Sequence, residues 1–155
     1  VAASIAIAMV DGTTKEIIDA GNQFGPEDSW LGRAMSHTRG LWNQHATIDD
    51  AWESLHKDLW TPSHSVAPEA IPQLYAILHY SDTNLREALF WAANFGRDAD
   101  TITAVVGAIC GARHGLEVIP KKWVSIVRKP AGVCLKFTAK EDIIDLSRQL
   151  ADLIR

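Results

Sequence analysis

Apolar residues recur every three or four positions along most of the chain, the spacing that places them on one face of an α-helix. This spacing predicts amphipathic helices over residues 31–42, 48–59, 71–78, 85–93 and 143–153. No alternation of period two persists long enough to require a sheet, and no repeat of 20–50 residues is present. The sequence therefore predicts an all-α protein with orthogonal or bundle-like helix packing.

Two further segments, residues 1–10 and residues 101–114, are apolar all round rather than on one face. A helix of this composition has no side suited to water, so we expect both to be buried. Residues 101–114 also carry many small side chains, and Gly107 and Gly111 would let a neighbouring helix approach closely. We expect this helix to be the central one, and residues 1–10 to be covered by another segment.

Capping patterns mark several helix boundaries. Thr13 and Glu16 have the spacing of a capping box before a helix that reaches about residue 23, and Thr47 is placed to cap the helix that follows it. Residues 138–141 have capping-box spacing before the last helix. The pattern is least regular over residues 124–137, part of which we expect to be extended.

The chain has 155 residues, of which 47% are hydrophobic and 22% charged, as expected for one soluble globular domain spanning residues 1–155. The net charge of −4 and the lack of a Lys/Arg block argue against nucleic-acid binding. No segment has the length of a membrane span or the basic start of a signal peptide, so we expect a cytoplasmic protein without membrane contacts. We expect Cys110 and Cys134, both in apolar stretches, to be reduced core residues.

The candidate chemistry lies in a polar loop, residues 94–101, that precedes the small-residue helix. Asp98 and Asp100 offer carboxylate oxygens and Thr101 a hydroxyl, the hard donors that Mg²⁺, Mn²⁺ or Ca²⁺ prefer. Because residues two apart point about 200° apart on a helix, we expect Asp98 in the loop and the other two in the cap or first turn. The alternative is that these residues only cap the helix.

Other candidate residues are scattered along the chain. The six histidines lack the paired spacing of a zinc site, and only His64 lies in a loop that could overhang a site. No serine-hydrolase elbow or P-loop motif occurs. Trp91 and Phe95 flank the acidic loop and are the aromatic residues best placed to contact a ligand there.

A count of charges limits what the acidic loop can bind. Two dications carry four positive charges, whereas Asp98 and Asp100 supply two negative ones beside a helix N-terminus that itself disfavours cations. The other acidic pair, Asp49 and Asp50, is placed to cap a helix. A site for two cations therefore needs carboxylates from elsewhere.

The string Asn-Phe-Gly-Arg-Asp-Ala-Asp-Thr-Ile at residues 94–102 resembles the ADP-ribosylglycohydrolase family, as do the Gly-Ala pairs at 107–108 and 111–112, and His-Gly, Ile-Pro and Trp between residues 114 and 123. That family includes dinitrogenase reductase-activating glycohydrolases and ADP-ribosyl-acceptor hydrolases. Its usual motif is Gly-Gly-Asp-Thr-Asp-Thr. Here Arg97 replaces the second glycine and Ala99 the first threonine, and neither change removes a ligand.

The resemblance implies an all-α fold of roughly double this length, with a binuclear Mg²⁺ or Mn²⁺ site built from two motifs. One motif is matched by Asp98, Asp100 and Thr101 as metal ligands, the two aspartates also being the catalytic candidates. Asn94 and Gly96 would shape the substrate-binding loop. The other motif, Thr-Asp-Asp, does not occur in this sequence, so residues 1–155 look like the C-terminal half of such a protein.

The function implied by the resemblance is metal-dependent removal of ADP-ribose from a modified protein or small molecule. The paired ions would hold the ribose hydroxyls distal to the adenosine, and a metal-associated water would attack the anomeric carbon. Two alternatives remain open. The chain could be a non-catalytic relative that binds ADP-ribose or has a structural role, as in jellyfish J-type crystallins, or one half of a split or proteolysed enzyme whose partner chain carries Thr-Asp-Asp.

Overall fold

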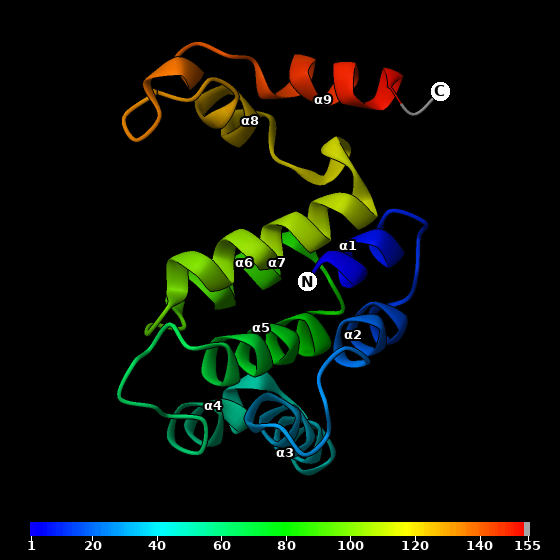
Figure 1. Ribbon diagram of the computed structural model, residues 1–155, viewed down its shortest axis with the longest axis vertical. Helices are drawn as coiled ribbons and strands as arrows, with labels where there is room; N and C mark the ends of the chain where they lie inside the picture. Colours follow the sequence, from blue (N-terminus) through cyan, green and yellow to red (C-terminus); the bar gives the residue numbers. More distant parts are fainter. Residues whose placement is uncertain (154–155) are drawn as a thin grey trace. The chain divides into compact units, whose positions relative to one another are not determined.

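The computed structural model describes residues 1–153, which fall into two compact units divided after residue 118 (Figure 1). Every regular element in the described residues is helical, which confirms the predicted all-α class. The single domain expected over residues 1–155 stays a prediction.

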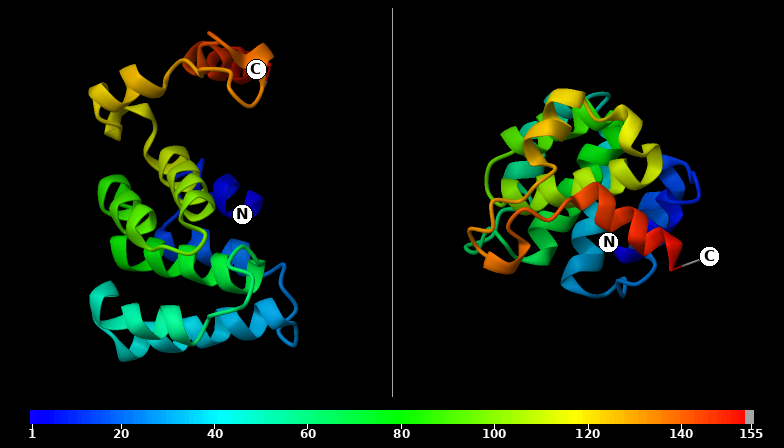
Figure 2. Two further views of the ribbon diagram at one scale, coloured as in Figure 1. Left: turned by 90° about the vertical axis from the view of Figure 1, so that its left-hand side faces the viewer. Right: turned by 90° about the horizontal axis from the view of Figure 1, so that it is seen from above.

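Unit 1, residues 1–118, has three layers, which the left view of Figure 2 shows edge-on. Its elements are α1 (Ala2–Ala8), α2 (Thr14–Asn22), α3 (Trp30–Gln44), α4 (Ile48–Lys57), α5 (Ala67–Ser81), α6 (Leu85–Asn94), α7 (Ala99–His114) and a 3-10 turn, Leu116–Val118. Helices α3 and α4 form one outer layer, α5 the middle, and α6 and α7 the opposite layer, with α1 and α2 packed beside α7 and α5. The middle helix thus contacts both outer layers.

The central helix is α5 rather than the predicted segment 101–114. Helix α5 has an almost continuous buried run from Pro72 to Leu78, whereas α7 buries one face, made of Ile102, Val106, Ile109 and Cys110. The prediction was wrong because small apolar residues give little contrast between the faces of a helix, while burial depends on how many neighbours surround it. Gly107 does face a close neighbour, since an added Cβ would lie 3.4 Å from Leu89 Cδ2 of α6; at Gly111 it would meet nothing within 4 Å.

The ends of the unit 1 helices follow the local signals. The Thr13–Glu16 capping box is present, and the Thr47 side chain accepts from the Asp50 backbone N–H at 3.2 Å, so both predicted caps are confirmed. Residues 1–10 differ from expectation. Helix α1 ends at Ala8 and buries only that residue and Ser4 among its members, so it is not buried all round.

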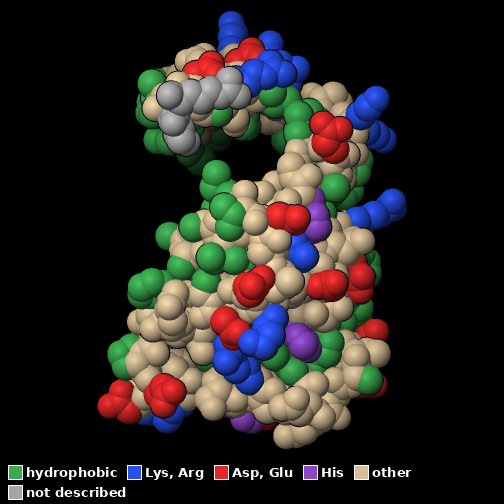
Figure 3. Space-filling model, turned by 90° about the vertical axis from the view of Figure 1, so that its right-hand side faces the viewer, with side chains coloured by type: hydrophobic (Ala, Val, Ile, Leu, Met, Phe, Trp, Pro, Cys, Tyr) green, Lys and Arg blue, Asp and Glu red, His purple; other side chains and the backbone are tan. Residues whose placement is uncertain are grey.

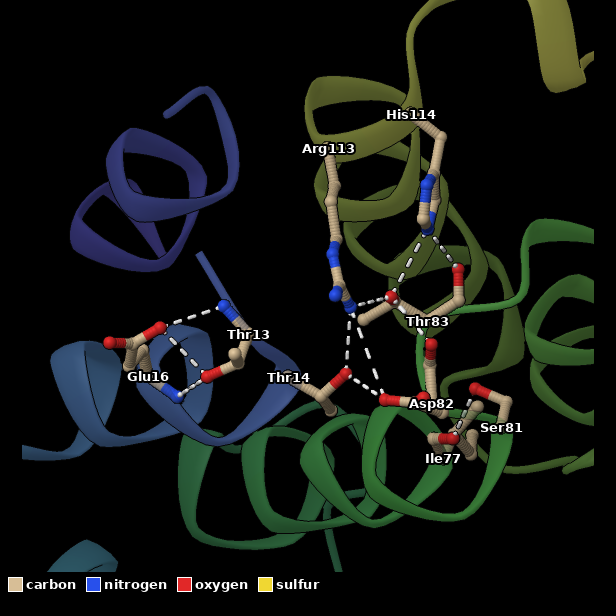
Figure 4. A network of polar contacts seen from close by, with 9 residues as sticks. All are labelled: Thr13, Thr14, Glu16, Ile77, Ser81, Asp82, Thr83, Arg113 and His114. Atoms are coloured by element: carbon tan, nitrogen blue, oxygen red, sulfur yellow. Dashed lines mark hydrogen bonds and ion pairs between the residues drawn. The ribbon is translucent and has the colours of Figure 1, made fainter. Parts of the chain in front are cut away.

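A polar network fixes the end of α7 that is remote from the acidic loop (Figure 4). Arg113 Nη1 donates to the hydroxyls of Thr14 and Thr83, at 2.8 Å for Thr14, and His114 Nε2 lies 3.1 Å from the Thr83 carbonyl oxygen. Asp82 and Thr83 have φ of 46° and 57°, left-handed values that such contacts must hold in place. The network ties α7 to the start of α2 and to the α5–α6 turn, and so fixes the direction of α7.

Unit 2, described from residue 119 to residue 153, contains α8 (Lys121–Val127), a 3-10 turn (Lys136–Thr138) and α9 (Ile143–Asp152). The expected extended conformation is wrong at residues 124–127, which are helical. The capping box expected at 138–141 is also wrong, because Asp142 caps α9 by accepting from the N–H of Ile144 and Asp145. Arg128 Nε donates to Asp142 at 2.6 Å and closes the unit.

The two cysteines lie in different surroundings. Cys110 is buried in α7, as predicted, whereas Cys134 is exposed in unit 2, and both are free thiols. The apolar neighbours of Cys134 in the sequence do not form a core around it. No helix within residues 1–153 is long and apolar enough to cross a membrane.

Candidate functional site: the acidic loop before α7

The predicted site residues lie in the turn that joins α6 to α7. Asn94 is the last residue of α6, and its side-chain amide donates to the Phe90 carbonyl at 2.8 Å. Gly96 and Arg97 have φ of 79° and 54°, and these two left-handed residues reverse the chain. An added Cβ at Gly96 would meet nothing within 4 Å, so the backbone conformation, not lack of space, favours glycine there.

Asp98 occupies the N-cap position of α7 but does not cap it. Its side chain makes no hydrogen bond to the backbone N–H groups of the first turn. Within the described residues its carboxylate has one hydrogen-bond partner, the Thr101 hydroxyl, which donates to Oδ1 at 3.0 Å. Asp98 is only 6% exposed. Simple capping therefore does not account for a carboxylate held in this buried position.

Asp100 and Thr101 lie in the first turn of α7, and both are exposed. Asp98 immediately precedes the helix, so the structure has the three residues in the order that the helical geometry predicts. Carboxylates at this end of a helix are stabilised by the free N–H groups and the positive end of the helix dipole. The loop and the first turn of α7 thus present the buried carboxylate of Asp98, the exposed carboxylate of Asp100 and the Thr101 hydroxyl.

Aromatic residues fix the start of the loop from α4. The ring of Phe95, which is 2% exposed, stacks on His56 with ring centroids 4.2 Å apart and also contacts Trp52. His56 Nε2 lies 2.7 Å from the Phe95 carbonyl oxygen, and His56 Nδ1 lies 2.7 Å from that of Trp52. Trp91 packs on Trp52. Phe95 is therefore a packing residue here rather than an exposed ligand contact.

An ion pair between Arg97, whose side chain is partly exposed, and the buried Glu69 holds the middle of the loop. Arg97 Nε donates to Glu69 Oε1 at 2.5 Å and Arg97 Nη2 to Glu69 Oε2 at 2.9 Å, and Glu69 is fully buried in the first turn of α5. Glu69 Oε2 also accepts from the Thr61 N–H at 2.8 Å and from its hydroxyl at 2.6 Å. The guanidinium lies over the Trp60 ring, 5.5 Å from its centroid. The loop is thus attached to α5 through a side chain that stands where the family motif has glycine.

These contacts hold Glu69 as a carboxylate. Burial by itself raises the pKa of Glu69, but the hydrogen bonds from Arg97 and Thr61 outweigh it, and the net pKa lies below its ordinary value. The hydrogen bond to Glu69 in turn raises the pKa of Arg97. Both partners are charged at neutral pH, so the pair adds no net charge beside the aspartates.

Sequence reasoning did not identify His56, Thr61 or Glu69. Each lies in an earlier helix or connection and has an ordinary local reading, Glu69 as an acidic residue of a helix first turn. The one available signal was Arg97, a bulky residue at a glycine position. His64, the histidine singled out in the sequence, is exposed in the connection before α5.

The donor atoms fit part of a metal coordination shell. Two carboxylates and a hydroxyl suit a hard divalent cation such as Mg²⁺ or Mn²⁺. Within residues 1–153, however, no three His, Cys, Asp or Glu side chains are grouped so that they could hold a metal ion. Asp98, Asp100 and Thr101 would therefore fill only part of a coordination shell, and water or ligands from outside the described residues would complete it.

A separate cavity of about 570 Å³ lies between α2, α3 and α5 and includes none of the candidate residues. Its lining combines Lys15 and Arg39 with Asp19 and Asp82. Arg39 and Lys15 both pair with Asp19, at 2.6 Å each. Figure 3 shows acidic, basic and histidine side chains intermixed on the side of the molecule where α1 and α2 lie. The paired charges give this cavity no evident preference for a charged ligand.

Comparison with known proteins identifies the family. The family model described as ADP-ribosylglycohydrolase matches residues 1–155, the whole chain. The chain belongs to the ADP-ribosylglycohydrolase family. This confirms the resemblance seen in the acidic loop and the Gly-Ala-rich helix.

Individual relatives match shorter parts of this family member. ADP-ribosylarginine hydrolase Tri1 of Serratia proteamaculans is 35% identical over 71 residues, covering 46% of this chain and 17% of the relative. ADP-ribosyl-[dinitrogen reductase] glycohydrolase of Rhodospirillum rubrum is 30% identical over 102 residues, covering 61% and 34%. ADP-ribosylhydrolase ARH3 of Mus musculus is 40% identical over 40 residues, covering 26% and 11%. No solved structure matches the chain.

The chain thus spans about a third or less of the length of these curated relatives. Membership of the ADP-ribosylglycohydrolase family applies to this chain.

Proposed function

We propose that this chain contributes the Asp-x-Asp-Thr half of a metal-dependent hydrolase that removes ADP-ribose from a modified protein or small molecule. The observation that carries the proposal is the conformation of Asp98, whose buried carboxylate is directed to Thr101 and not to the backbone of α7. Family membership over the whole chain gives that carboxylate its expected chemistry.

In this proposal Asp98, Asp100 and Thr101 hold a Mg²⁺ or Mn²⁺ centre. Such an ion, when bound, polarises substrate oxygens and lowers the pKa of its water. Thr101 donates to Asp98 Oδ1 and thereby orients the other carboxylate oxygen toward a ligand. Asp100, exposed in the first turn, would complete the contribution of the loop and help to orient the attacking water.

Asn94 and Gly96 would shape the substrate side of the loop. Gly96 has no side chain and an open surrounding, which lets a ligand approach the backbone there. Asn94 is exposed but its amide is bonded within α6, so its role would be to set the start of the loop. Neither residue supplies a group that could act as acid or base.

A binuclear centre would require a second set of ligands. The loop carries two negative charges against four positive ones, so we propose that a segment with the family's Thr-Asp-Asp motif, in a longer chain or a partner chain, supplies the rest. Residues 1–155 would then form the C-terminal half of one ADP-ribosylglycohydrolase-like fold. We also propose a cytoplasmic location for the protein. The names of two relatives mention ADP-ribosylarginine and ADP-ribosyl-dinitrogen reductase, which favours ADP-ribosylated protein side chains as substrates.

The alternative is a relative that binds ADP-ribose without cleaving it. The two possibilities differ in whether added metal-ligating residues produce hydrolysis, and not in the fold of this chain.

The test is a Mn²⁺ titration followed by calorimetry, with Asp98→Asn as the variant and Glu53→Gln, an exposed change on α4, as the matched control. We expect Asp98→Asn to lower Mn²⁺ affinity about 100-fold or more, since a ligating carboxylate becomes a neutral amide, and the control to match wild type. Hydrolysis of an ADP-ribosylarginine peptide should need a segment carrying Thr-Asp-Asp. Equal Mn²⁺ binding by wild type and Asp98→Asn would reject the proposed site.

A further inference from the structure

Arg97 is the residue directly before Asp98, and its partly exposed side chain reaches back to α5. Its Nε and Nη2 both donate to Glu69, and Nη2 also donates to the Thr61 carbonyl at 2.5 Å. The forked geometry fixes the direction of the guanidinium as well as its position. A fixed guanidinium restricts the peptide unit that carries Asp98.

We propose that Glu69 is a positioning residue for the acidic loop, acting through Arg97 to hold Asp98 in the orientation that binds a divalent cation. This inference rests on the proposed function for its metal, but the contacts that carry it belong to the chain itself. Among the described residues, the Glu69 carboxylate accepts hydrogen bonds from Thr61 and Arg97 and not from the residues of the acidic pair, so its influence on Asp98 passes through Arg97.

The backbone at Arg97 shows why an anchor is needed. Its φ of 54° lies in the left-handed region, which a residue with a Cβ adopts only when its surroundings hold it there. Gly96 beside it adopts φ of 79° without that cost. The ion pair to Glu69 is the contact that offsets the strain at Arg97 and keeps the second left-handed residue in place.

The anchor itself is rigid. Glu69 is fully buried and is bonded to both the N–H and the hydroxyl of Thr61. On the other side of Gly96, His56 Nε2 contacts the Phe95 carbonyl oxygen at 2.7 Å. The loop is therefore held at Phe95 and at Arg97, on either side of Gly96. Asp98 directly follows Arg97.

Glu69 also neutralises the positive charge of Arg97 beside the acidic loop. A free guanidinium beside the acidic loop would repel a divalent cation, whereas the paired one is neutralised by Glu69. Glu69→Gln would break the two-point contact with Arg97 and leave the positive charge of its guanidinium uncompensated. Arg97→Ala would release the loop and keep a Cβ at the left-handed position, so that the strain there is no longer offset.

The experiment measures Mn²⁺ affinity by calorimetry on the full chain, comparing wild type with Glu69→Gln, Arg97→Ala and the double variant. Each single change should weaken Mn²⁺ binding about 10-fold or more, the usual effect of removing a partner that orients a ligand. Because both residues act through one contact, the double variant should bind no more weakly than the weaker single variant. Glu53→Gln, which breaks the exposed pair with Lys57, is the control and should leave affinity unchanged.

Two results would overturn the positioning role. One is unchanged Mn²⁺ affinity in a folded Glu69→Gln or Arg97→Ala protein. The other is a double variant whose loss equals the product of the two single losses, which would mean that the residues act separately.

A second readout keeps this inference apart from the metal proposal. If wild type binds no Mn²⁺, the proposed metal site fails, and amide hydrogen exchange over residues 96–100 still tests the anchor. Glu69→Gln should speed exchange there about 10-fold relative to Glu53→Gln, while amides of residues 74–78 in α5 keep their wild-type rates. Equal acceleration at both places would show general destabilisation and reject a positioning role, as would no acceleration in the loop.

Discussion

Tyr75→Phe tests how α1 is attached to the rest of unit 1. The Tyr75 hydroxyl lies 2.7 Å from Ser4 Oγ, and this contact joins α5 to α1. Tyr75 is 1% and Ser4 0% exposed, so water cannot replace a lost partner at either group.

The expected cost follows from the buried group that remains. Removing the phenol oxygen leaves the Ser4 hydroxyl buried without its partner, which costs about 1–3 kcal/mol. Ser4→Ala leaves the buried Tyr75 hydroxyl without its hydrogen-bond partner, at a similar cost of about 1–3 kcal/mol. The double variant removes both polar groups, so its loss should be smaller than the sum of the two single losses, with a coupling of about 1–2 kcal/mol.

Urea unfolding followed by tryptophan fluorescence measures these differences, because five of the six tryptophans lie in unit 1. A loss of about 2 kcal/mol should lower the melting temperature by roughly 4–8 °C for a chain of this size. Additive losses in the double variant would refute the buried pair, because they would mean that each hydroxyl finds another partner or water.

The same tyrosine should make stability depend on alkaline pH. Burial raises the pKa of Tyr75 above 10.0, and the hydrogen bond from Ser4 only partly opposes this. The folded state therefore keeps the phenol proton more tightly than the unfolded state does. Stability from this group is present below about pH 10 and is lost as pH rises through the folded pKa, a loss absent in Tyr75→Phe.

Three further predictions follow from single contacts. Gly21→Ala should destabilise the fold by about 2 kcal/mol or more, as measured by urea unfolding, because its Cβ would lie 1.8 Å from the Tyr75 hydroxyl oxygen, closer than atoms can pack; wild-type stability would contradict this. One thiol, Cys134, should react with a thiol reagent at about pH 8 and the other only after unfolding, since burial raises the pKa of Cys110 to about 12; two fast thiols in the native protein would be inconsistent with this. The melting temperature of Arg97→Ala should lie roughly 2–4 °C below that of Arg97→Gly, because both variants lose the ion pair but only alanine keeps the left-handed strain. Equal melting temperatures would mean that the strain is small.

The acidic loop shows where local sequence is sufficient. The order of Asp98, Asp100 and Thr101 around the start of α7 follows from helical geometry, which relates neighbours along the chain. Whether Asp98 caps the helix could not be read in the same way. That depends on a choice between backbone N–H groups and the Thr101 hydroxyl, which the loop conformation decides.

The all-α class, most helix boundaries, the two caps at Thr13 and Thr47, and the family can be predicted from the sequence, because these features depend on residues a few positions apart. The central position of α5, the exposure of Cys134 and the ion pair between Arg97 and Glu69 could not be predicted, because they depend on how distant segments pack. Burial and ion pairing join segments distant in the chain, and a carboxylate in a helix first turn looks the same in sequence whether it faces water or an arginine. The physical reason is that patterns of period 3.6 encode which face of a helix is apolar, but not how many neighbours surround it.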